Sequence, residues 1–146
     1  DSVLQIQISN ILDEERKAKL IFMKPSLSGN NELRDHFFES LKIEKNREKE
    51  PWVISALTFL HHPLRSEESK KYIRPSLDLL EEIQSTGDIF FPKQWLDATF
   101  SGHSGIDAVI TVNVFLNENP DYPINLRNKI IQSSDMLFRA SQISGK

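Results

Sequence analysis

Apolar residues recur at helical spacing in one segment after another, and prolines and glycines separate these segments. Residues 52–60 are an example, with Pro51 before them and Pro63 after them. Proline fits the first helical position, where no backbone N–H is needed, and it interrupts later turns. The spacing forms one apolar stripe on a helix, which favours packing against another element. That stripe consists of Trp52, Val53, Ala56, Leu57 and Leu60.

The same pattern predicts helices on either side. Residues 13–24 begin with acidic side chains and are expected to end at Pro25. Asn31 is placed to cap the next helix by accepting an unpaired backbone N–H. Ser66 opens a helix that we expect to kink or restart at Pro75 and to stop at Gly87 in the left-handed conformation. The buried positions predicted in these last two helices are Leu33, Phe37, Phe38, Leu41, Ile73, Leu77, Leu80 and Ile83.

Three more helices are expected over residues 92–102, 104–120 and 123–140. In the second, the β-branched residues within 108–115 also fit a buried strand, but a single strand would have nothing to pair with. We therefore predict a central helix that is apolar on most sides.

The pattern as a whole predicts an all-α fold. Successive short helices joined by brief turns usually form antiparallel helix hairpins, stacked as a bundle or as a short HEAT/armadillo-like α-solenoid. Residues 1–146 are expected to form a single helical domain. Residues 1–12 fit a strand or a helix and are treated as an irregular or helical lead-in.

Composition excludes several classes of function. The 146 residues carry 18 Lys and Arg against 21 Asp and Glu, mixed along the chain, so we expect no binding to nucleic acid. No apolar run approaches the roughly 20 residues that span a bilayer, and no membrane insertion is expected. The lack of cysteine excludes disulfides, thiol nucleophiles and cysteine-ligated metals. Because the first residue is Asp1, we expect a processed product or a piece of a larger protein.

The stretch FSGHSGIDAV, residues 100–109, resembles the turn on which hydrolases mount a nucleophilic serine. That turn needs G-x-S-x-G, and here Ile106 replaces the final glycine. We interpret Gly102 as a helix stop, and Ser104 as an N-cap paired with Asp107 three residues later. A small hydrolase that uses Ser104 and His103 remains an alternative.

The histidines show no metal-binding spacing. No histidine begins the H-E-x-x-H pattern of zinc hydrolases, and the neighbours His61 and His62 would point about 100° apart on a helix. We expect all four at the surface or at helix ends. No catalytic, cofactor-binding or metal-ligating residue is therefore assigned to this chain. The four are His36, His61, His62 and His103.

Five stretches between Phe22 and Ala140 resemble the C-terminal region of bacterial aminopeptidase N-like zinc metallopeptidases, which belong to the gluzincin aminopeptidase family. In such enzymes an upstream domain holds zinc through H-E-x-x-H and a further glutamate, and a G-x-M-E-N-type segment meets the amino terminus of the peptide. This chain contains neither motif. The five stretches are FMKPSLS, NREKEPWVISALTFLHHPLR, YIRPSLDLLEEIQSTGDIFFPKQWLDATFSGHSG, NPDYP and LRNKIIQSSDMLFRA.

The resemblance implies a non-catalytic accessory domain of HEAT- or armadillo-like helix pairs, which walls the substrate chamber and limits peptide access to the zinc. Zinc would be bound only in the parent enzyme, and the partner of this chain would be the upstream catalytic domain of that enzyme. The chain would contact peptide substrates only indirectly. We consider His62 and Arg65 as side chains that face the chamber, although Arg65 equally fits a surface pair with Glu67 or Glu68. The alternative function is a free-standing helical-repeat module for protein interaction.

Overall fold

The structure is a computed structural model that describes residues 2–9 and 13–144. These described residues form helices and no strand, so the all-α prediction is confirmed. They fall into two compact units, residues 1–60 (unit 1) and residues 61–146 (unit 2), and each is described by itself. A single domain over residues 1–146 stays a prediction. None of the described helices has the length and apolar content that a bilayer crossing requires.

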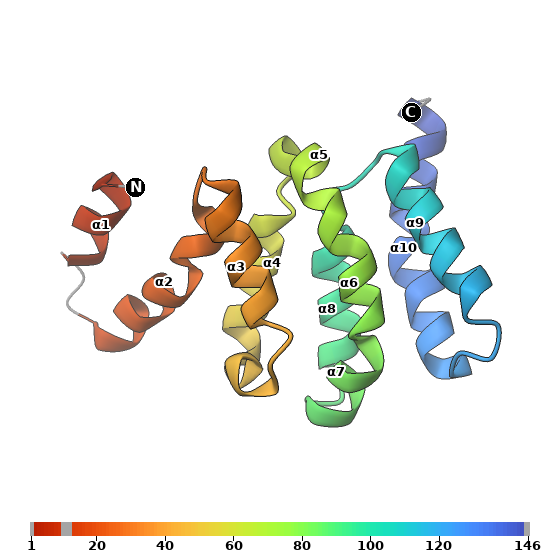
Figure 1. Cartoon of the computed structure of the whole chain (residues 1–146), viewed down its shortest axis with the longest axis horizontal. Helices are drawn as coiled ribbons and strands as arrows, with labels where there is room; N and C mark the ends of the chain where they lie inside the picture. Colours follow the sequence, from red (N-terminus) through yellow and green to blue (C-terminus); the bar gives the residue numbers. More distant parts are fainter. Residues whose placement is uncertain (1, 10–12, 145–146) are drawn as a thin grey trace. The chain divides into compact units, whose positions relative to one another are not determined.

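Unit 1 is organised around α2, which packs against both α3 and α4 (Figure 1). The ring of Phe22 in α2 lies 5.5 Å from the ring of Phe37 and 5.9 Å from that of Trp52, centroid to centroid. One aromatic residue thus contacts both neighbouring helices. Residues 1 and 10–12 of the expected lead-in lie outside the described residues. The elements are α1 (Ser2–Ser9), α2 (Glu14–Leu27), α3 (Asn31–Ser40), the 3-10 helix η1 (Glu44–Arg47) and α4 (Glu50–Leu60).

The predicted ends of the helices in unit 1 are wrong at two places. α2 continues through Pro25 to Leu27, because a proline this close to the helix end removes only one intrahelical hydrogen bond. The N-cap of α3 is Asn30 rather than Asn31. The side-chain oxygen of Asn30 accepts the backbone N–H groups of Glu32 at 2.8 Å and of Leu33 at 3.4 Å.

The predicted buried stripe of α3 is confirmed at Phe37, Phe38 and Leu41 but is wrong at Leu33. Leu33 is 44% exposed, and Arg34 takes the buried position one turn before Phe37 and Phe38. Its guanidinium donates to the carbonyl oxygen of Ser28 at 2.6 Å and to the side chain of Asn31. Because these bonds satisfy the charge, the aliphatic stem of Arg34 can pack in the interior.

Unit 2 contains two antiparallel helix pairs (Figure 1). In the first, α6 and α7 pack against α8, and in the second α9 packs against α10. The pairs meet in two layers, with α6 against α9 and α8 against α10. The elements are η2 (Pro63–Arg65), α5 (Ser66–Ser69), η3 (Lys70–Tyr72), α6 (Ile73–Asp78), α7 (Leu80–Thr86), α8 (Phe91–Phe100), α9 (Ile106–Glu118) and α10 (Ile124–Ser144).

Trp95 of α8 lies at the centre of unit 2 and is fully buried. Its indole N–H donates to the carbonyl oxygen of Ser76 in α6 at 3.0 Å, so the largest side chain of the interior is also satisfied as a donor. The stripe predicted for this segment is confirmed, since each member is fully buried. Its members are Ile73, Leu77, Leu80 and Ile83.

The long helix predicted from Ser66 to Gly87 is divided. The 3-10 helix η3 follows α5, and α6 starts at Ile73, two residues before the expected restart at Pro75. Gly87 does cap α7, but its φ of −107° and ψ of 179° are extended, so the left-handed prediction is wrong. The chain turns one residue later, where the side chain of Asp88 accepts the N–H of Phe90 at 2.9 Å.

Candidate functional site

Two histidines that are far apart in the sequence meet in the interior of unit 2. His61 directly precedes His62 and η2, and His103 lies in the turn between α8 and α9. His61 is fully buried and His103 is 7% exposed. Nδ1 of His61 lies 2.8 Å from Nε2 of His103, which is a hydrogen bond. The expectation of surface histidines is therefore wrong for this pair, although both do lie at helix ends; His36 and His62 are exposed, as predicted.

Glycine makes the approach of the two segments possible. A Cβ atom at Gly102 would lie 1.5 Å from the backbone carbonyl oxygen of His61. Any other residue would therefore push the 101–104 turn away from His61 and separate the two imidazoles. Gly102 does follow the end of α8, as predicted, but its essential property is the lack of a side chain at this contact.

The predicted cap at Ser104 is wrong. The N-cap of α9 is Gly105, and no side chain accepts a hydrogen bond there. Asp107 instead accepts from the ammonium group of Lys70 at 2.8 Å, and the same ammonium donates to Glu67 at 2.9 Å. The sequence spacing suggested a local cap, whereas the carboxylate of Asp107 is used to join η3 to α9.

Burial keeps both imidazoles of the pair neutral near pH 7. It lowers the pKa of His61 well below the usual 6.5, and the neighbouring His103 lowers it further. It also lowers the pKa of His103 to about 4. In a neutral pair one ring donates and the other accepts. Nε2 of His61 has no hydrogen-bond partner among the described residues, and the ring of Tyr72 stands edge-on to that of His61.

The contacts of the described residues do not pair a nucleophilic serine with a histidine that could act as its base. A hydrolase needs the serine hydroxyl within hydrogen-bond reach of the histidine, but the bond made by His103 goes to His61. Within the described ranges, no group of three or more His, Asp or Glu side chains is placed to hold a metal ion. The geometry of the pair fits a structural contact that joins two turns.

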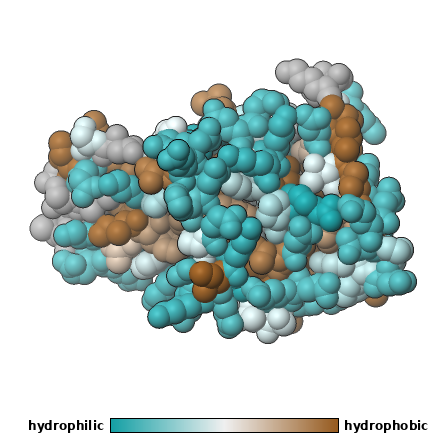
Figure 2. Space-filling model, viewed as in Figure 1, coloured by the Kyte–Doolittle hydropathy of each residue, from teal (hydrophilic) through white to brown (hydrophobic). Residues whose placement is uncertain are grey.

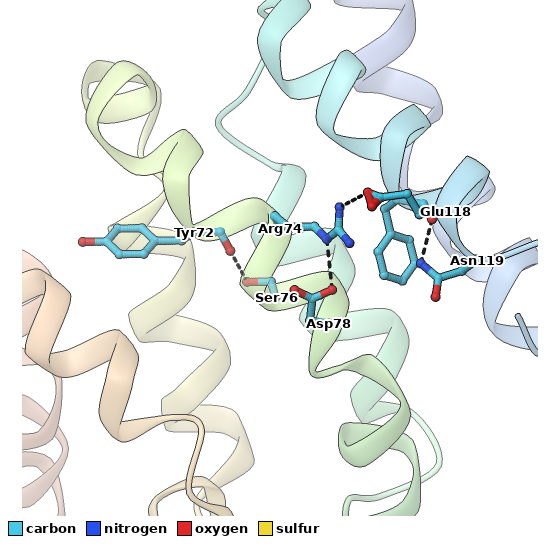
Figure 3. Close-up of polar contacts among 7 residues, drawn as sticks. Tyr72, Arg74, Ser76, Asp78, Glu118 and Asn119 are labelled. Atoms are coloured by element: carbon cyan, nitrogen blue, oxygen red, sulfur yellow. Dashed lines mark hydrogen bonds and ion pairs between the residues drawn. The ribbon is translucent and has the colours of Figure 1, made fainter.

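A second polar cluster joins α6 to α9 (Figure 3). Arg74 donates from Nε to Asp78 at 3.0 Å and from Nη1 to Glu118 of α9 at 2.7 Å. Its guanidinium also lies 5.3 Å from the ring centroid of Phe115. Because these side chains are about one-third to one-half exposed, each ion pair is worth at most about 1 kcal/mol. The cluster positions the two helix pairs against each other.

The two side chains proposed to face a chamber lie near the histidine pair. His62 is exposed, and its Nδ1 accepts the backbone N–H of Leu64 at 3.1 Å. Arg65 is half-buried. Glu67, one of the two acidic residues considered as a surface partner of Arg65, forms an ion pair with Lys70. A role for His62 or Arg65 toward a substrate stays a prediction.

Two hollows in the surface of unit 2 share His103 in their lining. The α8–α10 hollow, of about 520 Å³, lies between the end of α8, the 101–104 turn and α10. The α9 hollow, of about 310 Å³, lies at the start of α9 and is lined by the Lys70, Glu67 and Asp107 network. Sequence reasoning did not find either hollow, because their walls come from segments that are distant along the chain.

α9 exposes an apolar stripe, which we call the α9 stripe: Ile106, Ile110 and Val114, at 47%, 52% and 43% exposure. The helix itself is confirmed and the strand alternative is wrong. α9 is apolar on most sides, as predicted, but it is not the central helix expected, since only the face with Ala108 and Val112 is enclosed. On the face shown in Figure 2, hydrophobic residues gather over the region of α9 and α10, at the right of the view.

Comparisons with protein-family models, with curated proteins and with solved structures found no match to this chain.

Proposed function

We propose that this chain is a non-catalytic accessory domain of a zinc aminopeptidase, and that it walls the substrate chamber and limits which peptides reach a zinc site in an upstream domain. The five stretches between Phe22 and Ala140 support this proposal through their resemblance to that family. The stacked antiparallel helix pairs of unit 2 are the arrangement that HEAT- or armadillo-like repeats would produce.

The α9 stripe is the observation that carries the proposal. In a stack of helix pairs the terminal pair needs a polar outer face to stay soluble by itself. α9 instead presents Ile106, Ile110 and Val114 one helical turn apart on the side that packs against neither α6 nor α10. An apolar stripe of this kind is characteristic of a surface that another protein segment covers. In the proposed enzyme this cover is the rest of the polypeptide.

The chain would contribute shape and polar contacts rather than bond-breaking groups. Zinc would be bound by the upstream domain. His62 and Arg65 remain the side chains that we propose for the chamber wall, because a guanidinium suits a peptide carbonyl or carboxylate. The neutral pair of His61 and His103 would hold the wall in shape close to these residues.

The test compares three proteins: the complete product of the reading frame, the same product without this segment, and this chain alone. The complete product should bind one zinc and release amino acids from aminoacyl-p-nitroanilides. The product without this segment should keep its zinc and should hydrolyse long peptides relatively faster than the complete enzyme does. If the deletion product does not fold, the complete enzyme with His62→Ala and Arg65→Ala should show the same change in length preference.

Experiments on the isolated chain can contradict the proposal most directly. It should bind no zinc after dialysis and should release no amino acid. One tightly held equivalent of zinc, or chelator-sensitive turnover by this chain alone, would contradict a non-catalytic role. Labelling of Ser104 by a fluorophosphonate probe would instead support the small hydrolase.

A free-standing helical-repeat interaction module is the second candidate, because the α9 stripe also fits a surface that binds a separate protein. The two candidates differ in the complete reading frame. A product without zinc and without peptidase activity, whose protein partner is lost on Ile110→Asp but kept on the control Gln132→Asp, would favour the module. Gln132 is an exposed residue of α10 outside the α9 stripe.

A further inference from the structure

The α8–α10 hollow combines an apolar wall with a size typical of ligand sites. Its volume of about 520 Å³ falls within the range of roughly 300–1,000 Å³ that small-molecule sites occupy. Phe100 and Leu137 form its buried wall, while Met136 at 74% exposure lies at the rim. Because the side chain of Ala140 is small, the hollow stays open beside α10, and a larger side chain at this position would fill it.

Two polar groups in the lining are not fully used by the protein. His103 is more than nine-tenths buried, and its hydrogen bond to His61 uses Nε2, so Nδ1 is the ring nitrogen that this bond does not use. The hydroxyl of Ser133 is buried and has no hydrogen-bond partner within the described part of the chain. A binding site of this type needs a small number of placed polar groups on an apolar wall.

The charges around the hollow select an uncharged ligand. His103 is neutral near pH 7, because burial lowers its pKa to about 4. The carboxylate in the lining belongs to Asp97, which pairs with Lys93 of the same helix at 2.7 Å. An anionic ligand would lie beside this carboxylate without a cation in the lining to receive it. An aromatic ring would fit the apolar wall, and a hydroxyl group can both donate to and accept from an imidazole.

We propose that the α8–α10 hollow binds a small uncharged aromatic molecule that carries a hydroxyl group. The ring packs against Phe100, Leu137 and Met136, and the hydroxyl bonds to Nδ1 of His103. This inference is independent of the proposed function, since it concerns a site on unit 2 rather than a contact with peptides or zinc.

The probe is p-cresol, titrated into the full ¹⁵N-labelled chain at pH 7 and followed by ¹H–¹⁵N spectra. Binding should have a dissociation constant on the order of 1 mM, as for a fragment of this size. Shifts should be confined to the amides of residues 100–104 and 133–140 and to the His103 imidazole. The anion 4-methylbenzoate and the methyl ether 4-methylanisole should bind at least about fivefold more weakly.

Variants of α10 separate this site from general adsorption. Ala140→Phe fills the hollow and should weaken p-cresol binding by at least about tenfold, whereas Gln132→Phe adds the same ring outside the hollow and should change it by less than about twofold. Met136→Ala alters an exposed rim residue, so it keeps the fold, and it should weaken binding about threefold. Shifts spread over the chain, equal binding of 4-methylbenzoate or 4-methylanisole, or unchanged binding in both Ala140→Phe and Met136→Ala would overturn the proposal.

Discussion

The buried histidine pair makes the stability of unit 2 depend on pH in a defined direction. His103 has a folded-state pKa of about 4, whereas an unfolded histidine has the usual 6.5. Between these values the unfolded chain binds more protons than the folded chain, so stability falls as the pH falls. His103 alone therefore accounts for a loss of about 2–3 kcal/mol at pH 4.5 relative to pH 7, at about 1.36 kcal/mol per pKa unit.

His103→Gln removes this titrating group and keeps a side chain that can bond to His61. The variant should be less stable than the wild type at pH 7, and it should lose about 2–3 kcal/mol less than the wild type between pH 7 and pH 4.5. Carboxylates also titrate in this range, but they are common to both proteins and cancel in the difference. The titration of His61 is also common to both proteins and cancels to first order.

The assay is urea unfolding followed by the fluorescence of Trp95. The chain has two tryptophans, so Trp52→Phe is introduced into every protein to leave the probe in unit 2 alone. His36→Gln is the matched control, because it makes the same substitution at an exposed histidine outside unit 2. If His103→Gln and the wild type lose the same stability between pH 7 and 4.5, the neutral buried pair is refuted.

Three further changes test the packing and the surface of unit 2. Gly102→Ala places a methyl carbon 1.5 Å from the carbonyl oxygen of His61, so urea unfolding should show a loss of about 3 kcal/mol; a loss near zero would contradict the close approach. Trp95→Phe removes the hydrogen bond to Ser76 and leaves a cavity, which should cost about 2–3 kcal/mol in thermal unfolding; unchanged stability would contradict it. We expect the isolated chain to self-associate through the α9 stripe, and Ile110→Asp should abolish this in light scattering while changing stability by less than about 0.5 kcal/mol; a monodisperse wild-type monomer would count against the stripe as a contact surface.

Helical periodicity predicted the class of the fold because it depends on local spacing. The segment 108–115 shows this most clearly: its β-branched residues favour a strand individually, but its length and the lack of a pairing strand favoured α9, which is observed. The stripe from Ile73 to Ile83 was likewise predicted at each position.

The remaining features depend on contacts that no local spacing encodes. The pair formed by His61 and His103 joins residues 42 positions apart. Gly102 looked like an ordinary helix stop, although the carbonyl of His61 is the reason that glycine is required there.

A ¹⁵N spectrum of the imidazole nitrogens in the full chain at pH 7 tests the buried pair most directly. His61 and His103 should both be neutral, each with one protonated nitrogen, and a through-bond coupling should connect Nδ1 of His61 to Nε2 of His103. Both resonances should stay unchanged from pH 7 down to about pH 5. Two imidazoles that titrate independently near pH 6.5, with no coupling between them, would contradict the pair.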